Sequence, residues 1–377
     1  MLEKEIAELR RRFKNEKNNI SRIRGCLVNE KGEIISEFDQ TLGLLPPEAA
    51  EGLLGVMRKT LTGAVGKNLV DIAFSNDQVV AGSDEHNLLM ALRDSELSND
   101  DAVHELFARA IHSLRFEGNF LILLACDKYD VFGYSGSGER EEDAAEVFRY
   151  ITCSVCPVKL SRPMLSYIAY ENAFHAIAAN SVVSAPELGF LFPAFDDRTA
   201  NIYGALFYTK SAADIHAEFI EEIFKTGVPM PAAEQKQSFD DLLGQTVSDD
   251  RRYEVVQTVH DRVYDLVEDY KSHEQEEPLR LNKWAISGML KDCELAPPQL
   301  EAFERGFDER FGANAELCPQ NLVDVKQFYL QTPDVTIKVN PQRSDLVETR
   351  LIDGHRYILI RAEEGVEVNG VTVKITE

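Results

Sequence analysis

The chain has 377 residues and a formal net charge of −24, and 44% of its residues are hydrophobic and 28% charged. This length exceeds that of one ordinary domain and suits about two, each with a sizeable core. The negative charge argues against a broad, non-specific hold on nucleic acid or on an anionic membrane.

The sequence contains no segment that would direct it to a membrane or out of the cell. The longest apolar run, from Phe120 to Cys126, is far too short to cross a bilayer. Five of the first ten residues are charged, and the segment lacks the apolar core of a signal peptide. The six cysteines are sparse and unevenly spaced, unlike a disulfide framework. We therefore expect a soluble cytoplasmic protein.

The first predicted element is an amphipathic helix. Leu2, Ile6, Leu9 and Phe13 follow one another at spacings of 4, 3 and 4, which places them on one apolar stripe. The arginines of the same segment lie mostly off this stripe. The pattern predicts a helix with one buried face and one basic face.

The chain up to about residue 226 is predicted to mix strands with helices. Strands are expected in the β-branched and aromatic runs, at 20–28, 33–38, 120–127, 148–158, 174–177, 188–192 and 202–208. Helices are expected at 46–61, 83–93, 100–114 and 211–224. Residues 69–74 fit either a short strand or a turn of buried helix.

The segment from Thr226 to Pro231 breaks this pattern and is the best candidate for a domain boundary. Helices are expected beyond it at 253–270, 281–293 and 298–311, followed by alternating strands. Asn369-Gly370 between two such strands predicts a hairpin turn. We expect an α+β fold, with a mixed domain at 1–226 that contains a largely antiparallel sheet and a smaller helical-then-β domain at 227–377.

Cys153 and Cys156 form the one C-x-x-C pair in the sequence. A zinc site needs four ligands, and no second pair exists to supply them. The pair also lies in a run that resembles a strand, whereas a redox-active pair begins a helix whose dipole lowers the thiol pKa. We interpret both residues as buried structural cysteines, and we predict no metal and no cofactor.

Other candidate motifs lack the residues or the spacing that their function requires. The glycines at 133, 136 and 138 lack the Gly-Lys-Ser/Thr of a phosphate-binding loop and precede acidic residues. His104 and His112 lie eight residues apart, about 12 Å along a helix, which is too far for one metal ion. No nucleophile with a neighbouring base stands out, so no catalytic residue is predicted. Asp196-Asp197 is the least routine of the paired acids.

The charge changes sign in residues 1–24, which carry eight basic and four acidic residues, a net of +4 that leaves −28 for the rest. The candidate phosphate contacts in this segment and the strand after it are Arg10, Arg11, Arg12, Lys14, Arg22 and Arg24. Two alternatives stay open. The arginines either form only the solvent face of the helix, or they keep it soluble while its apolar stripe forms a homodimer.

Three segments together resemble an uncharacterised bacterial family, a domain of unknown function. They are Ile20 to Cys26, Cys153-x-x-Cys156-Pro157, and Thr332 to Pro341. The resemblance extends over nearly the whole chain. It implies a bacterial origin and carries no activity with it.

The order of elements is also similar to that of bacterial nucleoid-associated proteins, which are acidic and of comparable length. The similarity begins at Phe107-Ala-Arg-Ala110 with the strand after it. It continues through helices at 255–270, 279–290 and 303–311 to the strand at 335–339. That family supplies no catalytic motif, so no residue inherits a role. The similarity implies association with the nucleoid, with DNA or with proteins that act on DNA.

Our leading hypothesis is a non-enzymatic binding or scaffold protein, nucleoid-associated in its more specific form. Its expected partners are DNA or DNA-associated proteins, and no membrane is expected among them. The alternative is an enzyme whose site is assembled from distant residues, near Cys153 and Cys156 or near Asp196 and Asp197.

Overall fold

The structure is a computed structural model. It describes residues 1–377 except 15, 135–139, 197, 249–250, 273–278, 325–326, 363–364, 369–370 and 374–377. The chain forms two compact units, unit 1 (Met1–Ala232) and unit 2 (Ala233–Glu377). The division lies six residues beyond the boundary predicted at 226. The expected α+β class is confirmed, since helices accompany a large antiparallel sheet.

One sheet organises unit 1. Its strands lie in the order β2 (Ile34–Thr41), β1 (Arg22–Val28), β4 (Phe120–Tyr134), β5 (Arg140–Leu160), β9 (Leu188–Phe192), β12 (Gly204–Thr209) and β3 (Leu69–Ala73). Every neighbouring pair is antiparallel. The ambiguous segment 69–74 therefore contains a strand, because β3 pairs with β12 along its length.

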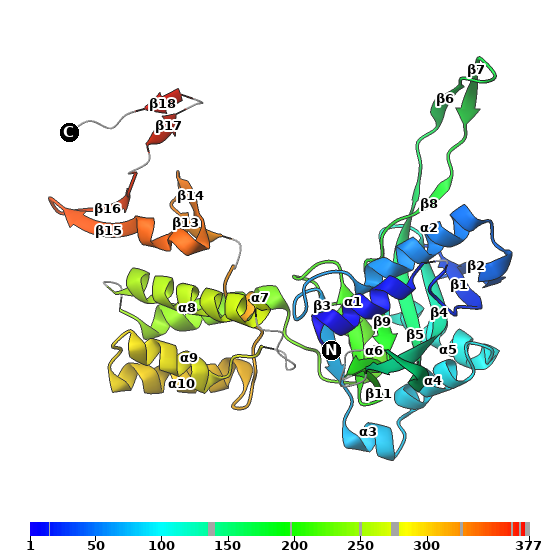
Figure 1. Ribbon diagram of the computed structural model, residues 1–377, viewed down its shortest axis with the longest axis horizontal. Coiled ribbons are helices and arrows are strands. Elements are labelled where there is room, and N and C mark those ends of the chain that lie inside the picture. Colours follow the sequence, from blue (N-terminus) through cyan, green and yellow to red (C-terminus); the bar gives the residue numbers. More distant parts are fainter. Residues whose placement is uncertain are drawn as a thin grey trace. The chain divides into compact units, whose positions relative to one another are not determined.

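Helices cover both faces of this sheet (Figure 1). One face bears α1 (Glu3–Arg12) and α2 (Pro47–Arg58), and the other bears α4 (Asp84–Asp94), α5 (Asp100–Ser113) and α6 (Ala217–Phe224). The apolar run in β4 serves both sides, since Leu121 and Leu123 pack toward α1 while Ile122 and Leu124 pack toward α5. A strand buried on both faces needs such an unbroken apolar sequence.

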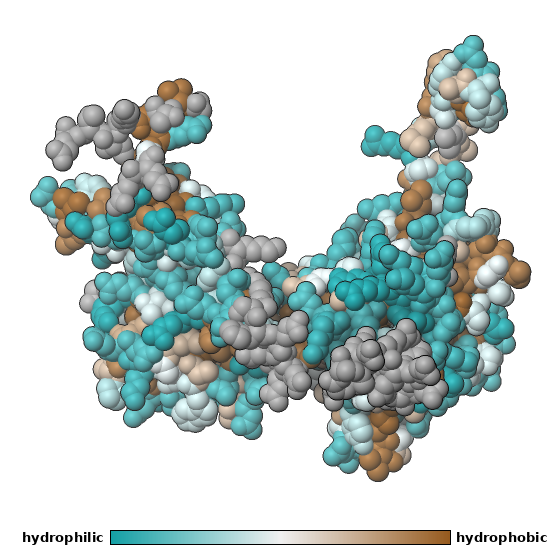
Figure 2. Space-filling model, in the orientation of Figure 1, coloured by the Kyte–Doolittle hydropathy of each residue, from teal (hydrophilic) through white to brown (hydrophobic). Residues whose placement is uncertain are grey.

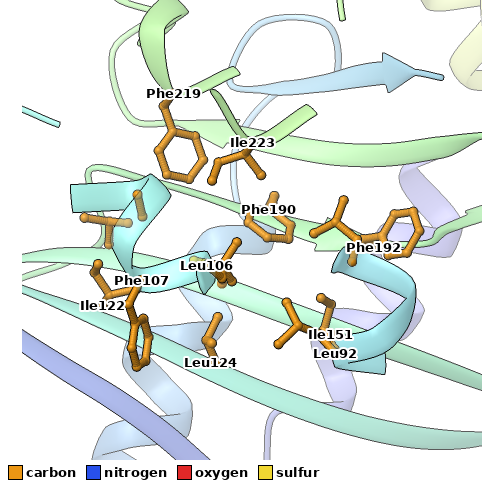
Figure 3. Close-up of a cluster of buried hydrophobic side chains, with 14 of the residues drawn as sticks. Leu92, Leu106, Phe107, Ile122, Leu124, Ile151, Phe190, Phe192, Phe219 and Ile223 are labelled. Atoms are coloured by element: carbon orange, nitrogen blue, oxygen red, sulfur yellow. The ribbon is translucent and has the colours of Figure 1, made fainter. Parts of the chain in front are cut away.

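The core on the α5 side is mostly aromatic and aliphatic (Figure 3). Phe190 and Phe192 of β9 lie among Leu106 of α5 and Phe219 and Ile223 of α6. Helix α6 begins at Ala217 and not at the expected Ser211. The hydroxyl of Thr209 donates to the carbonyl oxygens of Ser211 and Asp214, which holds that stretch in a turn.

The remaining elements of unit 1 are short. They are α3 (Asn76–Val80), β6 (Met164–Ile168), β7 (Ala173–Ile177), β8 (Ser181–Val183), β10 (Ala194–Asp196), β11 (Thr199–Asn201), and two 3-10 turns at Leu42–Leu44 and Lys59–Leu61. Strands β6 and β7 form a hairpin of their own, and β8 pairs with the end of β5.

Unit 2 begins with helices and ends with hairpins, in the order that the sequence predicts. The helices are α7 (Ala232–Thr246), α8 (Arg252–Ser272), α9 (Lys283–Asp292), α10 (Pro297–Phe311) and α11 (Pro319–Leu322). They enclose a separate core that includes Phe239, Val259 and Phe303. Helix α7 was not expected.

Three hairpins complete unit 2. They pair β13 (Phe328–Gln331) with β14 (Thr336–Val339), β15 (Val347–Ile352) with β16 (His355–Ile360), and β17 (Val366–Val368) with β18 (Val371–Val373). A 3-10 stretch, Pro341–Leu346, lies between β14 and β15. The turn predicted at Asn369-Gly370 falls outside the described residues.

Within the described ranges, no helix is both long and apolar enough to cross a membrane.

Candidate functional site

Arg12, at the end of α1, is held inside unit 1 by Asp127 of β4. Its Nε donates to Asp127 Oδ2 at 2.8 Å, and its Nη2 donates to Oδ1 at 3.1 Å and to the Lys128 carbonyl oxygen at 3.0 Å. Asp127 also accepts from the Tyr150 hydroxyl at 2.9 Å and from the Asn19 backbone N–H at 2.7 Å. Its side chain is only 1% exposed. This guanidinium is therefore committed to a buried ion pair.

The surroundings of this pair are consistent with a structural role. Burial acts to lower the pKa of Arg12, but the hydrogen bond and the charge of Asp127 outweigh it and raise that pKa. Burial, with the charge of Asp127, raises the pKa of Tyr150 far above its ordinary value, so the phenol stays neutral and donates. The Arg12 guanidinium also lies 4.7 Å from the centre of the Tyr129 ring.

Arg22 and Arg24, both in β1, also have carboxylate partners. Arg24 is buried, and its Nη1 donates to Asp100 Oδ1 at 2.6 Å and to the Leu97 carbonyl oxygen at 3.3 Å. Arg22 Nε lies 3.2 Å from Asp39 Oδ1 in the neighbouring strand. Three of the six candidate phosphate contacts thus already face carboxylates of the same unit.

Arg10, Arg11 and Lys14 differ from these three. Arg11 and Lys14 are exposed and Arg10 is half-buried, and none of their side chains has an ionic partner among the described residues. They lie at or just beyond the C-terminal end of α1, where basic side chains also compensate the helix dipole. Of the six predicted phosphate contacts, these three are therefore the ones without an ionic partner among the described residues.

The apolar stripe of α1 packs inside unit 1. Ile6, Leu9 and Phe13 are almost fully buried against the sheet, in the same cluster as Leu54 of α2 and Tyr150 of β5. A homodimer through this helix would need the stripe to be exposed. The stripe is therefore not available at the surface of unit 1, and the expected homodimer through this helix stays a prediction.

Cys153 and Cys156 lie in β5 with their side chains fully buried, and neither is in a disulfide. Burial raises the pKa of Cys156 to about 12 and raises that of Cys153 further still. Thiols of this kind are protonated at neutral pH and are poor nucleophiles.

The carboxylate of Asp196 is also engaged. It accepts a hydrogen bond from Asn201 Nδ2 at 2.7 Å and lies 3.1 Å from the amino nitrogen of Met1. Asp197 falls outside the described residues. Over the part of the chain that the structure describes, no three His, Cys, Asp or Glu side chains come together to hold a metal ion.

Unit 2 contains a pocket between its helices and its first hairpin. Its floor is apolar and includes Phe239, Val259 and Phe328, and Lys236 and Asp240 lie at its edge. These two charges pair with each other at 3.2 Å, and burial raises the pKa of Asp240. The pocket therefore combines an apolar lining with polar side chains, which also include Arg252, His260, Asp324 and Gln327.

The feature that sequence reasoning missed is a hairpin that leaves the sheet. Strand β5 continues beyond the sheet to Leu160, and the chain then forms β6 and β7 before it returns as β8. We call residues 159–183 the arm. Figure 1 shows it projecting away from the body of unit 1. As far as the described residues show, the hydrogen bonds of residues 161–180 stay within the arm.

The arm carries apolar side chains without a core to cover them. Those that are exposed are Leu160, Met164, Leu165, Tyr167, Tyr170, Phe174, Val182 and Val183. Leu165 is 70% exposed and Phe174 is 69% exposed. Figure 2 shows hydrophobic residues both along the stalk of the arm and at its tip. Aromatic residues with few charges between them were the signal in the sequence, but they equally fit a buried strand.

One family model matches residues 1–371, and its description is "Domain of unknown function (DUF4317)". The chain belongs to this family. No curated protein and no solved structure matches the chain.

The matched range of the DUF4317 family includes all of unit 1, the arm and almost all of unit 2. The family relation expected from Ile20 to Cys26, Cys153 to Pro157 and Thr332 to Pro341 is confirmed. The family description assigns no activity.

Proposed function

We propose that this member of the DUF4317 family is a non-enzymatic binding or scaffold protein that holds a partner protein on its arm. The observation that supports this is the set of exposed apolar side chains on β6 and β7. A two-stranded hairpin is marginally stable in water by itself. Contiguous apolar surface outside the core commonly marks a protein interface.

The residues considered for an enzyme favour the same proposal. Cys153 and Cys156 are buried with raised thiol pKa values, and the Asp196 carboxylate is engaged by Asn201 and the Met1 amino group. An active site needs titratable groups that reach a substrate. Protein recognition needs only an accessible and complementary surface.

Site-specific photo-crosslinking tests the proposal. A photoreactive amino acid replaces Tyr170 at the tip of the arm, and in a matched variant it replaces Leu44, which lies on the body of unit 1. These side chains are 86% and 85% exposed, so their accessibility is equal. In the cells that make the protein, we expect a covalent adduct from position 170 and none from position 44. Absence of an adduct at 170, or equal adducts at both positions, would contradict the proposal.

A second candidate function is contact with nucleic acid, in line with the similarity to nucleoid-associated proteins. The observation that favours it is the group formed by Arg10, Arg11 and Lys14, which have no ionic partner among the described residues. Three phosphate contacts would give weak binding that falls as salt rises, because counterions are released on contact. The net charge of −24 opposes such binding.

A mobility-shift assay at low salt tests this candidate. We expect Arg10→Glu, Arg11→Glu and Lys14→Glu together to abolish the shift. The matched control changes the charge equally at three separate exposed lysines, with Lys31→Glu, Lys67→Glu and Lys225→Glu. An equal loss in both variants would show that only the net charge matters. No shift with the unaltered chain would exclude direct binding.

A further inference from the structure

We propose that one apolar face of the arm packs against the same face of the arm in a second copy of the chain. This inference rests on the proposed function, because it names the partner that the arm holds.

The register of the hairpin defines the face. Leu165 pairs with Ala176 and Tyr167 pairs with Phe174. Alternate residues of a strand share a face, so these four side chains lie on one side of the hairpin. The rings of Tyr167 and Phe174 are 5.0 Å apart and extend this surface across both strands. We call these four residues the apolar face.

The opposite face carries Met164 and Ile168 but, unlike the apolar face, also polar side chains. Ser166 pairs with His175 there, and His175 Nε2 lies 2.7 Å from Glu171 Oε2. A partner that buried this side would have to displace water from an imidazole and a carboxylate. Burial is therefore favoured on the apolar face and opposed on the other.

The size of the arm suits a small interface between two copies. Residues 159–183 are 25 in number, and packing through one face buries only part of them, fewer than the roughly 20–30 residues that a standard interface uses on each side. Two arms that lie along one another would contribute the same face from both copies. The same surface on both partners is the property of a two-fold symmetric contact.

The distribution of charge favours the arms as the place where two copies meet. The arm contains Lys159, Arg162 and Glu171 as its charged residues, a net of +1 that leaves −25 for the rest of the chain. Repulsion between two copies is therefore weak at the arms, and elsewhere it acts between bodies that are acidic except in residues 1–24. From residue 160 to residue 169 a strand extends about 30 Å, since each residue adds about 3.3 Å. The screening length at physiological salt is only about 8 Å.

Contact through the arms thus keeps two acidic bodies several screening lengths apart. An anionic membrane or a nucleic acid would face the same repulsion, with only Lys159 and Arg162 on the arm to offset it. A strongly basic protein would be drawn to the acidic body and not to the nearly neutral arm. The arm of a second copy is nearly neutral, and its apolar face matches the apolar face of the first.

Sedimentation velocity of the full chain tests the inference. We expect the mass of the unaltered protein to rise with concentration from 42.4 kDa toward twice that value. Leu165→Glu places a charge on the apolar face and should weaken association at least tenfold. Ser166→Glu places the same charge on the next residue, on the opposite face, and should leave association unchanged. Circular dichroism confirms that both variants keep their fold.

The outcomes separate this inference from the proposed function. A protein that stays monomeric up to its solubility limit overturns the inference, and so does equal loss of association in the two variants. If the adduct at position 170 contains another protein and never a second copy, the inference fails while the proposed function stands. If position 170 gives no adduct, the proposed function fails. A second pair, Phe174→Glu and His175→Glu, repeats the comparison in β7.

Discussion

At the scale of single residues, the buried Arg12–Asp127 pair makes unit 1 sensitive to the loss of one charge. Replacement of Arg12 by methionine leaves Asp127 buried with hydrogen bonds from Tyr150 and Asn19 but with no counter-charge. Breaking a buried pair from one side typically costs about 3–5 kcal/mol. We expect Arg12→Met to lower the unfolding free energy of unit 1 by that amount in urea titrations.

The control for this prediction lies one residue away. Arg11 is exposed and has no ionic partner in the described part of the chain, so Arg11→Met should change stability by less than about 0.5 kcal/mol. Equal urea midpoints for the two variants would show that Asp127 does not depend on Arg12.

A second prediction concerns Asp100, whose pKa lies below its ordinary value mainly because Arg24 donates a hydrogen bond to it. A carboxyl group with a depressed pKa in the folded state stabilises the fold above its unfolded pKa of about 3.9. That contribution is lost as the pH falls through the lower pKa that Asp100 has in the folded state. We expect Arg24→Gln to raise the Asp100 pKa, as measured by carboxyl-carbon NMR titration.

Arg22 provides the comparison, because it is the weakest of the groups that lower the Asp100 pKa. Arg22→Gln should therefore move this pKa much less than Arg24→Gln does. If both substitutions move it equally, the effect comes from overall positive charge and not from the hydrogen bond at 2.6 Å.

At the scale of elements, strand β9 depends on a glycine. A side-chain carbon at Gly189 would lie 2.3 Å from the Cys153 carbonyl oxygen in β5 and 2.7 Å from Thr60. The Thr60 hydroxyl is also hydrogen-bonded to that of Ser154 in β5, at 2.7 Å. Gly189→Ala therefore has to displace either a strand or a buried hydrogen bond. We expect it to destabilise unit 1 by about 1–3 kcal/mol in thermal or urea unfolding.

Gly55 in α2 is the matched control for this substitution. A side-chain carbon there meets no atom within 4 Å, and the residue lies inside a helix. Gly55→Ala should stabilise by roughly 0.5–1 kcal/mol, because alanine is the better helix former. Stability changes of opposite sign in the two variants would locate the constraint at the contact between β9 and β5. Changes of the same sign would refute it.

The sequence predicts elements well where a local pattern determines them. The apolar run from Phe120 to Cys126 predicts a buried strand, and the structure explains the run because both of its faces are covered. The arm shows where such reasoning stops. Tyr167 and Phe174 have the alternation of core strands, and whether another element covers them depends on distant parts of the chain.

The candidate site likewise depends on contacts between residues that are distant in the sequence. The basic character of residues 1–24 is visible in the sequence, but the partner of Arg12 is 115 residues further along the chain and that of Arg24 is 76. The spacing of residues carries no information about such pairs. Sequence reasoning therefore located a basic segment correctly and could not tell that Arg12, Arg22 and Arg24 already face carboxylates.

At the scale of the whole molecule, the net charge of −24 sets how self-association should respond to salt. The screening length is about 30 Å at 0.01 M salt and about 8 Å at 0.15 M. Since the arm spans about 30 Å, two bodies joined by their arms still repel each other at the lower concentration and hardly at the higher. We expect association of the unaltered chain to strengthen a few-fold over this range, as measured by sedimentation.

The direction of this response discriminates between mechanisms. Nucleic-acid binding through Arg10, Arg11 and Lys14 would weaken over the same range, because salt competes for the phosphates. Attachment of the arm of one copy to the acidic body of another, through Lys159 and Arg162, would weaken as well. Leu165→Glu is the control, and it should remain monomeric at both salt concentrations. Self-association that strengthens with salt and requires Leu165 fits apolar contact through the arm, and association that weakens with salt would exclude it.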